Sequence, residues 1–380
     1  MPFLRWLRGR FSLQHAAPRP ERSQGRSIDA RRDSHAAVNE LSRLLTEKQH
    51  DNACNNGAAD ISLALGNLFR AQGDIDRAVA LREAVLADAA NDPAAASLRA
   101  RTYFELGCDY LRAGFIDRAH NAFREAAGLG FSAESIHMQL AKMYADSGDF
   151  AAAAAEYGRL HMPFAKAAFL VRQASETAAL GKDDAAMRLL REALAVYPGS
   201  PEAWAALACM SLLAGDATRT IALLADGLKK CTESCKLILL EKLYSFATGP
   251  AAPDIPPAAL AETALGIGRL LQNDSSVTML YYAGLLHHLT GKLDEAEQNF
   301  SKALVLDHGF WAARLALLGI CAKRESLAPL LEQQVAFFTE QGAKSKRFIC
   351  RPCGMRRETI FSECPRCRAW HSALFRTRLT

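Results

Sequence analysis

The chain has 380 residues, of which 50% are hydrophobic, and a formal net charge of +5 at pH 7. This length and apolar content allow a sizeable buried core, which excludes a chain that is disordered throughout. No stretch approaches eighteen uninterrupted apolar residues, so we expect no transmembrane helix, and the 10 cysteines form no disulfide framework, which favours a reducing compartment.

The net charge is divided unevenly along the chain. Residues 1–27 carry +5, residues 28–343 carry −8 and residues 344–380 carry +8. Basic ends of this kind suit acidic proteins, anionic lipid or nucleic acid. A solvated basic surface explains the same charge equally well, so the charge alone does not identify a binding partner.

The first thirteen residues mix Phe3, Trp6 and Phe11 with three arginines. This segment is too charged for a secretory signal. It predicts either an interfacial segment that makes weak contact with an anionic membrane or a disordered tail. Pro18 and Pro20 then indicate a linker, and we assign residues 1–34 to this basic tail.

Self-similarity with a period close to 34 residues dominates residues 35–343. Each copy has a small residue in a first helix, a turn glycine often followed by Asp, and alanines with an aromatic residue in a second helix. This pattern is typical of tetratricopeptide repeats. Because each helix pair exposes an apolar stripe that the next pair covers, we predict an all-α superhelical solenoid. The turn glycines are Gly73, Gly114, Gly148, Gly181, Gly215 and Gly291.

The interval between Gly215 and Gly291 is about two repeats long. Cys235–Ala247 has a helical pattern, so we expect a degenerate repeat there. Residues 248–257 contain four prolines, which break the helix, and we interpret them as a connector. Residues 311–340 predict the last helices, with Leu330, Val335 and Phe338 on an apolar face.

The end of the chain carries the strongest chemical signal. Cys350-Arg-Pro-Cys353 and Cys364-Pro-Arg-Cys367 are two Cys-x-x-Cys knuckles separated by ten residues. Paired knuckles direct four sulfurs at one ion, so Cys350, Cys353, Cys364 and Cys367 predict a site for one metal ion, Zn or Fe. Four thiolates leave no open coordination position, which indicates a structural or regulatory site. We assign residues 344–380 to a small rubredoxin-like or zinc-ribbon domain.

No catalytic motif accompanies this site. The sequence has no Walker-type glycine loop, no Gly-x-Ser-x-Gly elbow and no His-Glu-x-x-His. His287 occupies a repeat position that normally holds an aromatic ring, so packing explains it. His371 follows Cys367 by four residues, but four cysteines already complete the site. We therefore expect that the protein is not an enzyme and has no catalytic residues. We expect the array to form a concave groove that binds proteins.

Two parts of the chain together resemble the bacterial lipopolysaccharide assembly protein B family. The resemblance rests on Leu65-Gly-Asn-Leu-Phe-Arg70, on Gly73-Asp-Ile-Asp-Arg-Ala78, on Glu105-Leu-Gly-Cys-Asp-Tyr110 and on Cys364-Pro-Arg-Cys-Arg-Ala-Trp370. That family joins a tetratricopeptide array to a C-terminal rubredoxin-like metal domain. The resemblance implies that the four cysteines hold the metal and that the metal domain docks on the array, with Trp370 at the contact.

The resemblance also implies a function. Such proteins are non-enzymatic adaptors at the inner face of the bacterial cytoplasmic membrane, which help a membrane-anchored ATP-dependent protease to degrade the deacetylase of lipid A synthesis. Members typically begin with a transmembrane helix, which this sequence lacks. We therefore expect a cytoplasmic protein with at most peripheral membrane contact.

Two other functions stay open from the residues alone. One is a soluble tetratricopeptide scaffold or co-chaperone in which the metal stabilises a segment too small to fold alone. The other is a nucleic-acid-associated protein whose basic four-cysteine ribbon contacts phosphate. The negative charge of residues 28–343 disfavours the second, because an acidic array would repel a nucleic-acid backbone.

Overall fold

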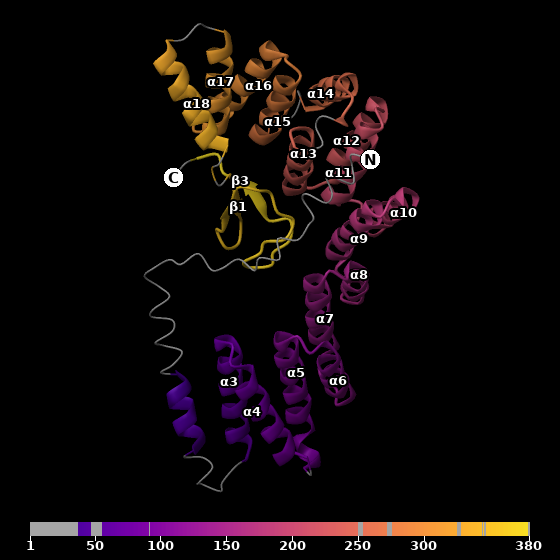
Figure 1. Cartoon of the computed structure of the whole chain (residues 1–380), viewed down its shortest axis with the longest axis vertical. Helices are drawn as coiled ribbons and strands as arrows, with labels where there is room; N and C mark the ends of the chain where they lie inside the picture. Colours follow the sequence, from indigo (N-terminus) through magenta and orange to yellow (C-terminus); the bar gives the residue numbers. More distant parts are fainter. Residues whose placement is uncertain are drawn as a thin grey trace. The chain divides into compact units, whose positions relative to one another are not determined.

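The computed structural model describes residues 37–46, 55–90, 92–249, 254–271, 276–324, 328–343, 345 and 347–378 (Figure 1). The basic tail at residues 1–34, including the expected membrane contact of residues 1–13, lies outside these residues. The described chain is helical as far as residue 343 and ends in a small sheet, which confirms the predicted fold class.

Most of the helices follow one another in antiparallel pairs. A first helix spans residues 37–46. The others are α3 (Asn55–Gln72), α4 (Ile75–Asp88), the short 3-10 helix η1 (Pro93–Ala95), α5 (Ala96–Ala113), α6 (Ile116–Gly128), α7 (Ala133–Ser147), α8 (Phe150–Arg159), α9 (Pro163–Ala179), α10 (Asp183–Val196), α11 (Pro201–Leu213), α12 (Ala217–Lys230), α13 (Glu233–Ala247), α14 (Pro257–Leu271), α15 (Val277–Leu289), α16 (Leu293–Leu306), α17 (Trp311–Arg324) and α18 (Pro329–Ala343).

The chain forms two compact units that divide inside the array. The N-terminal unit ends at Leu160 and contains α3 to α8, and the C-terminal unit runs from His161 to the end of the chain. The C-terminal unit therefore contains both α9 to α18 and the cysteine-bearing segment. We refer to these two parts as the N-terminal unit and the C-terminal unit.

The turns within the helix pairs have the conformation that the sequence predicts. All six turn glycines have positive φ, between 76° and 89°, in the left-handed region that glycine tolerates best. The aspartates that follow three of them cap the next helix. Asp74, Asp149 and Asp216 each accept a hydrogen bond from a backbone N–H three residues ahead, which satisfies a donor at the helix start.

Small residues let the two helices of a pair approach closely. A Cβ atom added at Gly107 would lie 2.6 Å from the ring of Phe123, and one at Gly284 would lie 2.5 Å from the ring of Phe300. Both rings are at least 98% buried. The small residues of the repeat therefore leave space for a core aromatic of the partner helix, as the pattern predicts.

The interval before Gly291 contains the degenerate repeat that the sequence predicts. Its first helix, α13, packs between α11 and α15, and its second helix, α14, packs against α12 and α15. At the end of the array the prediction is less accurate. Leu330 and Phe338 of α18 are 72% and 53% exposed, because only a narrow face of that helix packs on α17.

A three-stranded antiparallel sheet follows the last helix. Its strands are β1 (Phe348–Cys350), β2 (Arg356–Arg357) and β3 (Ala373–Phe375), in the order β2-β1-β3. Phe348 and Phe375 from these strands belong to the same hydrophobic core as Tyr281 and Phe310 of the array. We call residues 347–378 the ribbon, and Figure 1 shows it against α13.

Candidate metal centre and its contact with the repeats

The first cysteine pair lies on a tight loop between β1 and β2. The backbone N–H of Cys350 donates to the carbonyl of Met355 at 2.8 Å, and the N–H of Gly354 donates to the carbonyl of Cys350 at 2.9 Å. Gly354 has φ 67°, so the chain reverses directly after Cys353. This reversal places both sulfurs on the same side of the loop.

The second pair repeats this geometry. The N–H of Arg368 donates to the carbonyl of Cys364 at 2.8 Å, and the N–H of Cys364 donates to the carbonyl of Ala369 at 2.9 Å. Arg368 has φ 59°, where the first loop has glycine. Its guanidinium also pairs with Glu363 at 3.2 Å. The two loops are therefore related in structure, although their sequences share only the Cys-x-x-Cys pattern.

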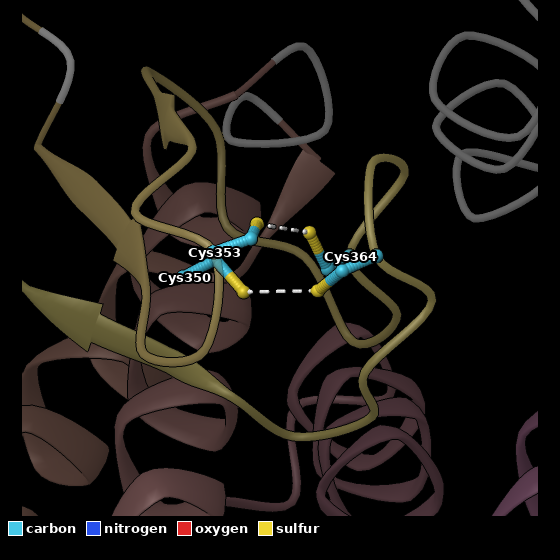
Figure 2. Close-up of side chains that lie close together, drawn as sticks. Cys350, Cys353 and Cys364 are labelled. Carbon is cyan, nitrogen blue, oxygen red and sulfur yellow. Dashed lines mark hydrogen bonds between the residues drawn. The ribbon is translucent and has the colours of Figure 1, made fainter.

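The four sulfurs converge between the two loops. Figure 2 shows Cys350 and Cys353 on one loop facing Cys364 on the other. The Sγ atoms of Cys350 and Cys367 are 3.6 Å apart, as are those of Cys353 and Cys364, and all four lie within 4.8 Å of one another. Zinc–sulfur bonds of about 2.3 Å in a tetrahedron require sulfur separations of about 3.8 Å, so the arrangement fits one metal ion.

The donor set limits the chemistry of this site. Four thiolates are the ligands of structural zinc and of mononuclear iron, and they leave no position for a substrate. Burial alone disfavours the Cys350 thiolate, but Ser372 Oγ at 3.4 Å and the backbone N–H of Cys353 bring the pKa of Cys350 down to about 7. The pKa of Cys350 therefore lies near neutral pH, whereas burial raises the pKa of Cys364 to about 12.

Aromatic side chains fix the ribbon on the array. The ring of Trp370 lies 5.9 Å from Phe164 and 6.1 Å from Phe169, both on α9. At the opposite end of the ribbon, Phe375 lies 5.4 Å from Tyr281 of α15 and 5.3 Å from Phe310. These tilted or edge-on ring contacts extend one apolar core from the array into the ribbon.

Polar contacts complete the attachment. The indole Nε1 of Trp311, the first residue of α17, donates to the carbonyl of Arg376 at 2.8 Å. Arg347 pairs with Glu241 of α13 at 3.4 Å, and both side chains are largely buried. Together with the aromatic contacts, the ribbon reaches the first helix of every pair from α9 to α17.

His371 makes a further ion pair between the ribbon and the array. Its Nε2 lies 3.3 Å from Oε1 of Glu202 on α11, and its ring stacks on Tyr197 with centroids 5.9 Å apart. Burial disfavours a charged imidazole, but hydrogen bonds with Cys235 and Glu202 outweigh it and raise the pKa of His371 to about 10. Burial likewise opposes the carboxylate, yet the contact with His371 lowers the pKa of Glu202 to about 2.

These shifts define the pH range of the contact. The raised pKa of His371 gives stability that is complete below about 6.5 and lost as pH rises through about 10. The lowered pKa of Glu202 gives stability that is present above about 4.5 and lost as pH falls through about 2. The ion pair is therefore intact at neutral pH and holds the ribbon on α11.

The structure brings together all four cysteines that the sequence singles out, and His371 lies outside their cluster. Sequence reasoning missed Glu202 and Glu241, because both look like ordinary carboxylates on a helix surface. It also assigned Cys235 only to a helical segment, whereas its thiol is a partner of His371. Of the residues at the contact between ribbon and array, only Trp370 was predicted. No local sequence pattern marks Glu202, Glu241 or Cys235.

Comparisons with known proteins support the repeat assignment. Three tetratricopeptide repeat family models match residues 62–96, 104–163 and 167–208. Among solved structures, the chain is similar to yeast Tom70, with 13% identity, 85% of this chain and 75% of that chain covered and a TM-score of 0.29. It is also similar to the P58(IPK) TPR domain, with 15% identity, 82% and 100% covered and a TM-score of 0.20.

One group of curated relatives matches the chain over nearly its whole length. Lipopolysaccharide assembly protein B of Escherichia coli K12 is 23% identical over 384 residues, which cover 96% of this chain and 93% of that protein. The proteins of the same name from E. coli O6:H1 and O157:H7 match to the same extent. The chain therefore contains tetratricopeptide repeats and is similar to this protein over nearly its whole length. No helix among the described residues has the length and apolar character needed to cross a membrane.

Proposed function

We propose that this protein is a non-enzymatic adaptor that acts as lipopolysaccharide assembly protein B is expected to act. Its repeats would bind an enzyme of lipid A synthesis, the deacetylase, and a membrane-anchored ATP-dependent protease, so that proteolysis adjusts lipopolysaccharide supply. The observation that carries this proposal is the similarity over 96% of the chain, which spans both the array and the cysteine segment. A scaffold of tetratricopeptide repeats suits such a role because it presents extended surfaces to other proteins.

The metal centre would be the structural part of this adaptor. In our proposal Cys350, Cys353, Cys364 and Cys367 hold one zinc or iron ion, supported by the convergence of their sulfurs within 4.8 Å. The ion would fix the C-terminal domain at residues 344–380, which includes the ribbon and is too small to fold by a hydrophobic core alone. The array at residues 35–343 would supply the binding surfaces, and the basic tail at residues 1–34 would precede it.

The ribbon covers part of the array, so less of the array surface remains for a large partner. In the C-terminal unit the first helices of the pairs already contact the ribbon through residues such as Phe169, Glu202 and Tyr281. We therefore propose that the main partner surface of the adaptor lies on α3, α5 and α7 of the N-terminal unit. Residues 1–13 would add weak contact with anionic lipid at the inner face of the cytoplasmic membrane.

Affinity purification tests this function. The tagged protein would be isolated from its own host, with Cys364→Ser as the test variant and Cys321→Ser as the control, because Cys321 is exposed and lies outside the cluster. We expect mass spectrometry to find a membrane-anchored protease and lipid A enzymes with the wild type and the control. Cys364→Ser should recover less of them, because an unanchored ribbon exposes the core of the C-terminal unit and lowers the amount of folded protein, although the proposed main partner surface lies on the N-terminal unit.

Recovery of neither the protease nor any lipid A enzyme, with other proteins bound to the wild type instead, would contradict the proposal. Such a result would favour a scaffold or co-chaperone with different clients. Retention of the same partners by Cys364→Ser would leave the adaptor role standing but show that the metal centre does not contribute to it.

A further inference from the structure

The four clustered cysteines differ in their access to solvent. Cys350 and Cys364 are 1% and 0% exposed. Cys353 is half-buried, and Cys367 is exposed. Cys350 lies in the central strand β1 of the sheet, whereas Cys367 lies in the outer loop that carries the second cysteine pair. A small oxidant that arrives from solvent therefore meets the sulfur of Cys367 first.

The sulfur of Cys367 also has a reaction partner within reach. The Sγ atom of Cys350 lies 3.6 Å from it, and Cys353 and Cys364 form the other close pair at 3.6 Å (Figure 2). A disulfide holds its sulfurs about 2.05 Å apart, so the two sulfurs must approach each other by about 1.5 Å. Cys350 is held in β1 with β2 and β3 on either side, so this movement belongs to the loop of Cys367.

A role as metal ligand keeps Cys367 in its reactive form. The thiolate, not the thiol, attacks an oxidant, and a thiol that coordinates a metal ion is deprotonated outright. Cysteines that combine exposure with thiolate character are the ones that peroxides oxidise. Cys321 is also exposed but lies outside the four-cysteine cluster, so it provides a comparison within the same chain.

We propose that Cys367 is a modification site for peroxides and that Cys350 converts its oxidised form into a disulfide. The Cys367 thiolate attacks one oxygen of hydrogen peroxide, the O–O bond breaks, hydroxide leaves and Cys367 becomes a sulfenic acid. The Cys350 thiolate then attacks the Cys367 sulfur. In that step the S–S bond forms, the S–O bond breaks and a second hydroxide leaves. The two thiolates together lose two electrons, which the peroxide gains.

The disulfide removes two of the four sulfur ligands. Structural zinc sites use four ligands, so Cys353 and Cys364 alone are too few to retain the ion. The disulfide joins the same two loops that the four ligands join through the ion, so the ribbon keeps a cross-link while its outer loop changes shape. This proposal rests on the four-thiolate centre proposed above and gives that centre a regulatory role in the adaptor.

The test uses the full-length protein loaded with zinc and hydrogen peroxide as the oxidant. We expect loss of about one zinc ion for each disulfide formed, and peptide mass spectrometry should assign that disulfide to Cys350 and Cys367. Dimedone, which traps sulfenic acids, should label Cys367 and Cys321 at short times but not the buried Cys364. A dithiol reductant with fresh zinc should then restore zinc binding, because a disulfide is reversible whereas a sulfinic acid is not.

Two results of this experiment would overturn the proposal. One is retention of zinc at peroxide concentrations that oxidise Cys321. The other is a disulfide within the first cysteine pair, Cys350 with Cys353, because Cys367 would then not be the site of attack. A protein that takes up no zinc at all would contradict the metal centre as well, whereas zinc that is bound and then retained contradicts only the peroxide reaction.

Two ligand variants separate the redox role of Cys367 from its role as a ligand. Cys367→Ser and Cys353→Ser each remove one sulfur, so both should weaken zinc binding. With zinc in excess, only Cys367→Ser should lose the peroxide-induced disulfide, and Cys353→Ser should still join Cys350 to Cys367. The control Cys321→Ser should change neither zinc release nor the disulfide. Equal loss of the disulfide in both ligand variants would contradict the assignment to Cys367.

Discussion

At the scale of single residues, the first repeat carries a buried arginine where other repeats carry an aromatic ring. A Cβ at Gly66 would lie 2.7 Å from the guanidinium of Arg82, just as one at Gly107 would meet Phe123. Arg82 is fully buried and pairs with Asp109 Oδ2 at 3.3 Å, and Asp109 also pairs with Arg70 at 2.9 Å. A buried ion pair between consecutive repeats thus replaces part of the apolar core.

Removal of the acid from this pair should destabilise the N-terminal unit. Asp109→Asn removes the nearer carboxylate partner of the buried Arg82 and leaves only Glu105 Oε2, at 3.9 Å; breaking a buried pair costs about 3–5 kcal/mol in comparable cases. The double variant Arg82→Phe with Asp109→Leu restores an apolar pair and should recover most of that loss. Urea unfolding monitored by circular dichroism measures the stability of both variants. Equal stability of Asp109→Asn and the wild type would contradict this account.

Sequence reasoning could not predict this pair. An arginine in the second helix of a repeat looks like a solvent-facing residue, and its partner Asp109 lies 27 residues ahead in the next repeat. The small residue in the first helix is part of the repeat pattern, but nothing in the sequence shows that a guanidinium fills the space beside Gly66. Burial and pairing of charged groups depend on tertiary contacts, which local patterns do not contain.

At the scale of secondary-structure elements, helix pairing follows the repeat pattern closely, and His287 shows how a polar residue is accommodated. The sequence predicts a packing role for His287, and this residue of α15 is 98% buried, with its ring directly against Gly268 of α14. Neither ring nitrogen has a hydrogen-bond partner among the described residues. Burial lowers the pKa of His287, although Glu295 opposes this effect and Lys292 adds to it.

This histidine should make the C-terminal unit sensitive to acid. Its pKa is lowered in the folded state, so the unfolded chain takes up a proton first, and stability is lost as pH falls below about 6.5. His287→Phe should raise the melting temperature at pH 5 more than at pH 8. His308→Gln, at an exposed histidine on the same unit, is the control. An equal change in melting temperature at both pH values would show that His287 does not titrate on unfolding.

The ribbon shows a similar limit of prediction. Two Cys-x-x-Cys pairs are a local pattern, so the convergence of four cysteines could be predicted. The left-handed conformation of Arg368 and the pairing of His371 with Glu202 could not, because both depend on the path that the ribbon takes over distant helices. Sequence alone therefore identifies the four cysteines that converge, but not the residues that hold their segment on the array.

At the scale of the whole molecule, the cysteine segment is continuous with the array. Phe348, Phe375 and the buried Cys350 and Cys364 share one hydrophobic core with α11 to α17. A metal ion in this position would stabilise more than its own loop, since ordering of the ribbon covers the apolar surface of the first helices. The metal centre and the ribbon contacts would then act together within the C-terminal unit.

X-ray absorption spectroscopy of the purified full-length protein tests this account most directly. We predict one zinc or iron ion per chain, identified by its absorption edge, with four sulfur neighbours at about 2.3 Å and no nitrogen or oxygen neighbours. Cys364→Ser should reduce the sulfur count or lose the ion altogether. A protein that carries no metal when purified anaerobically, or an ion with fewer than four sulfur ligands, would contradict the four-thiolate centre.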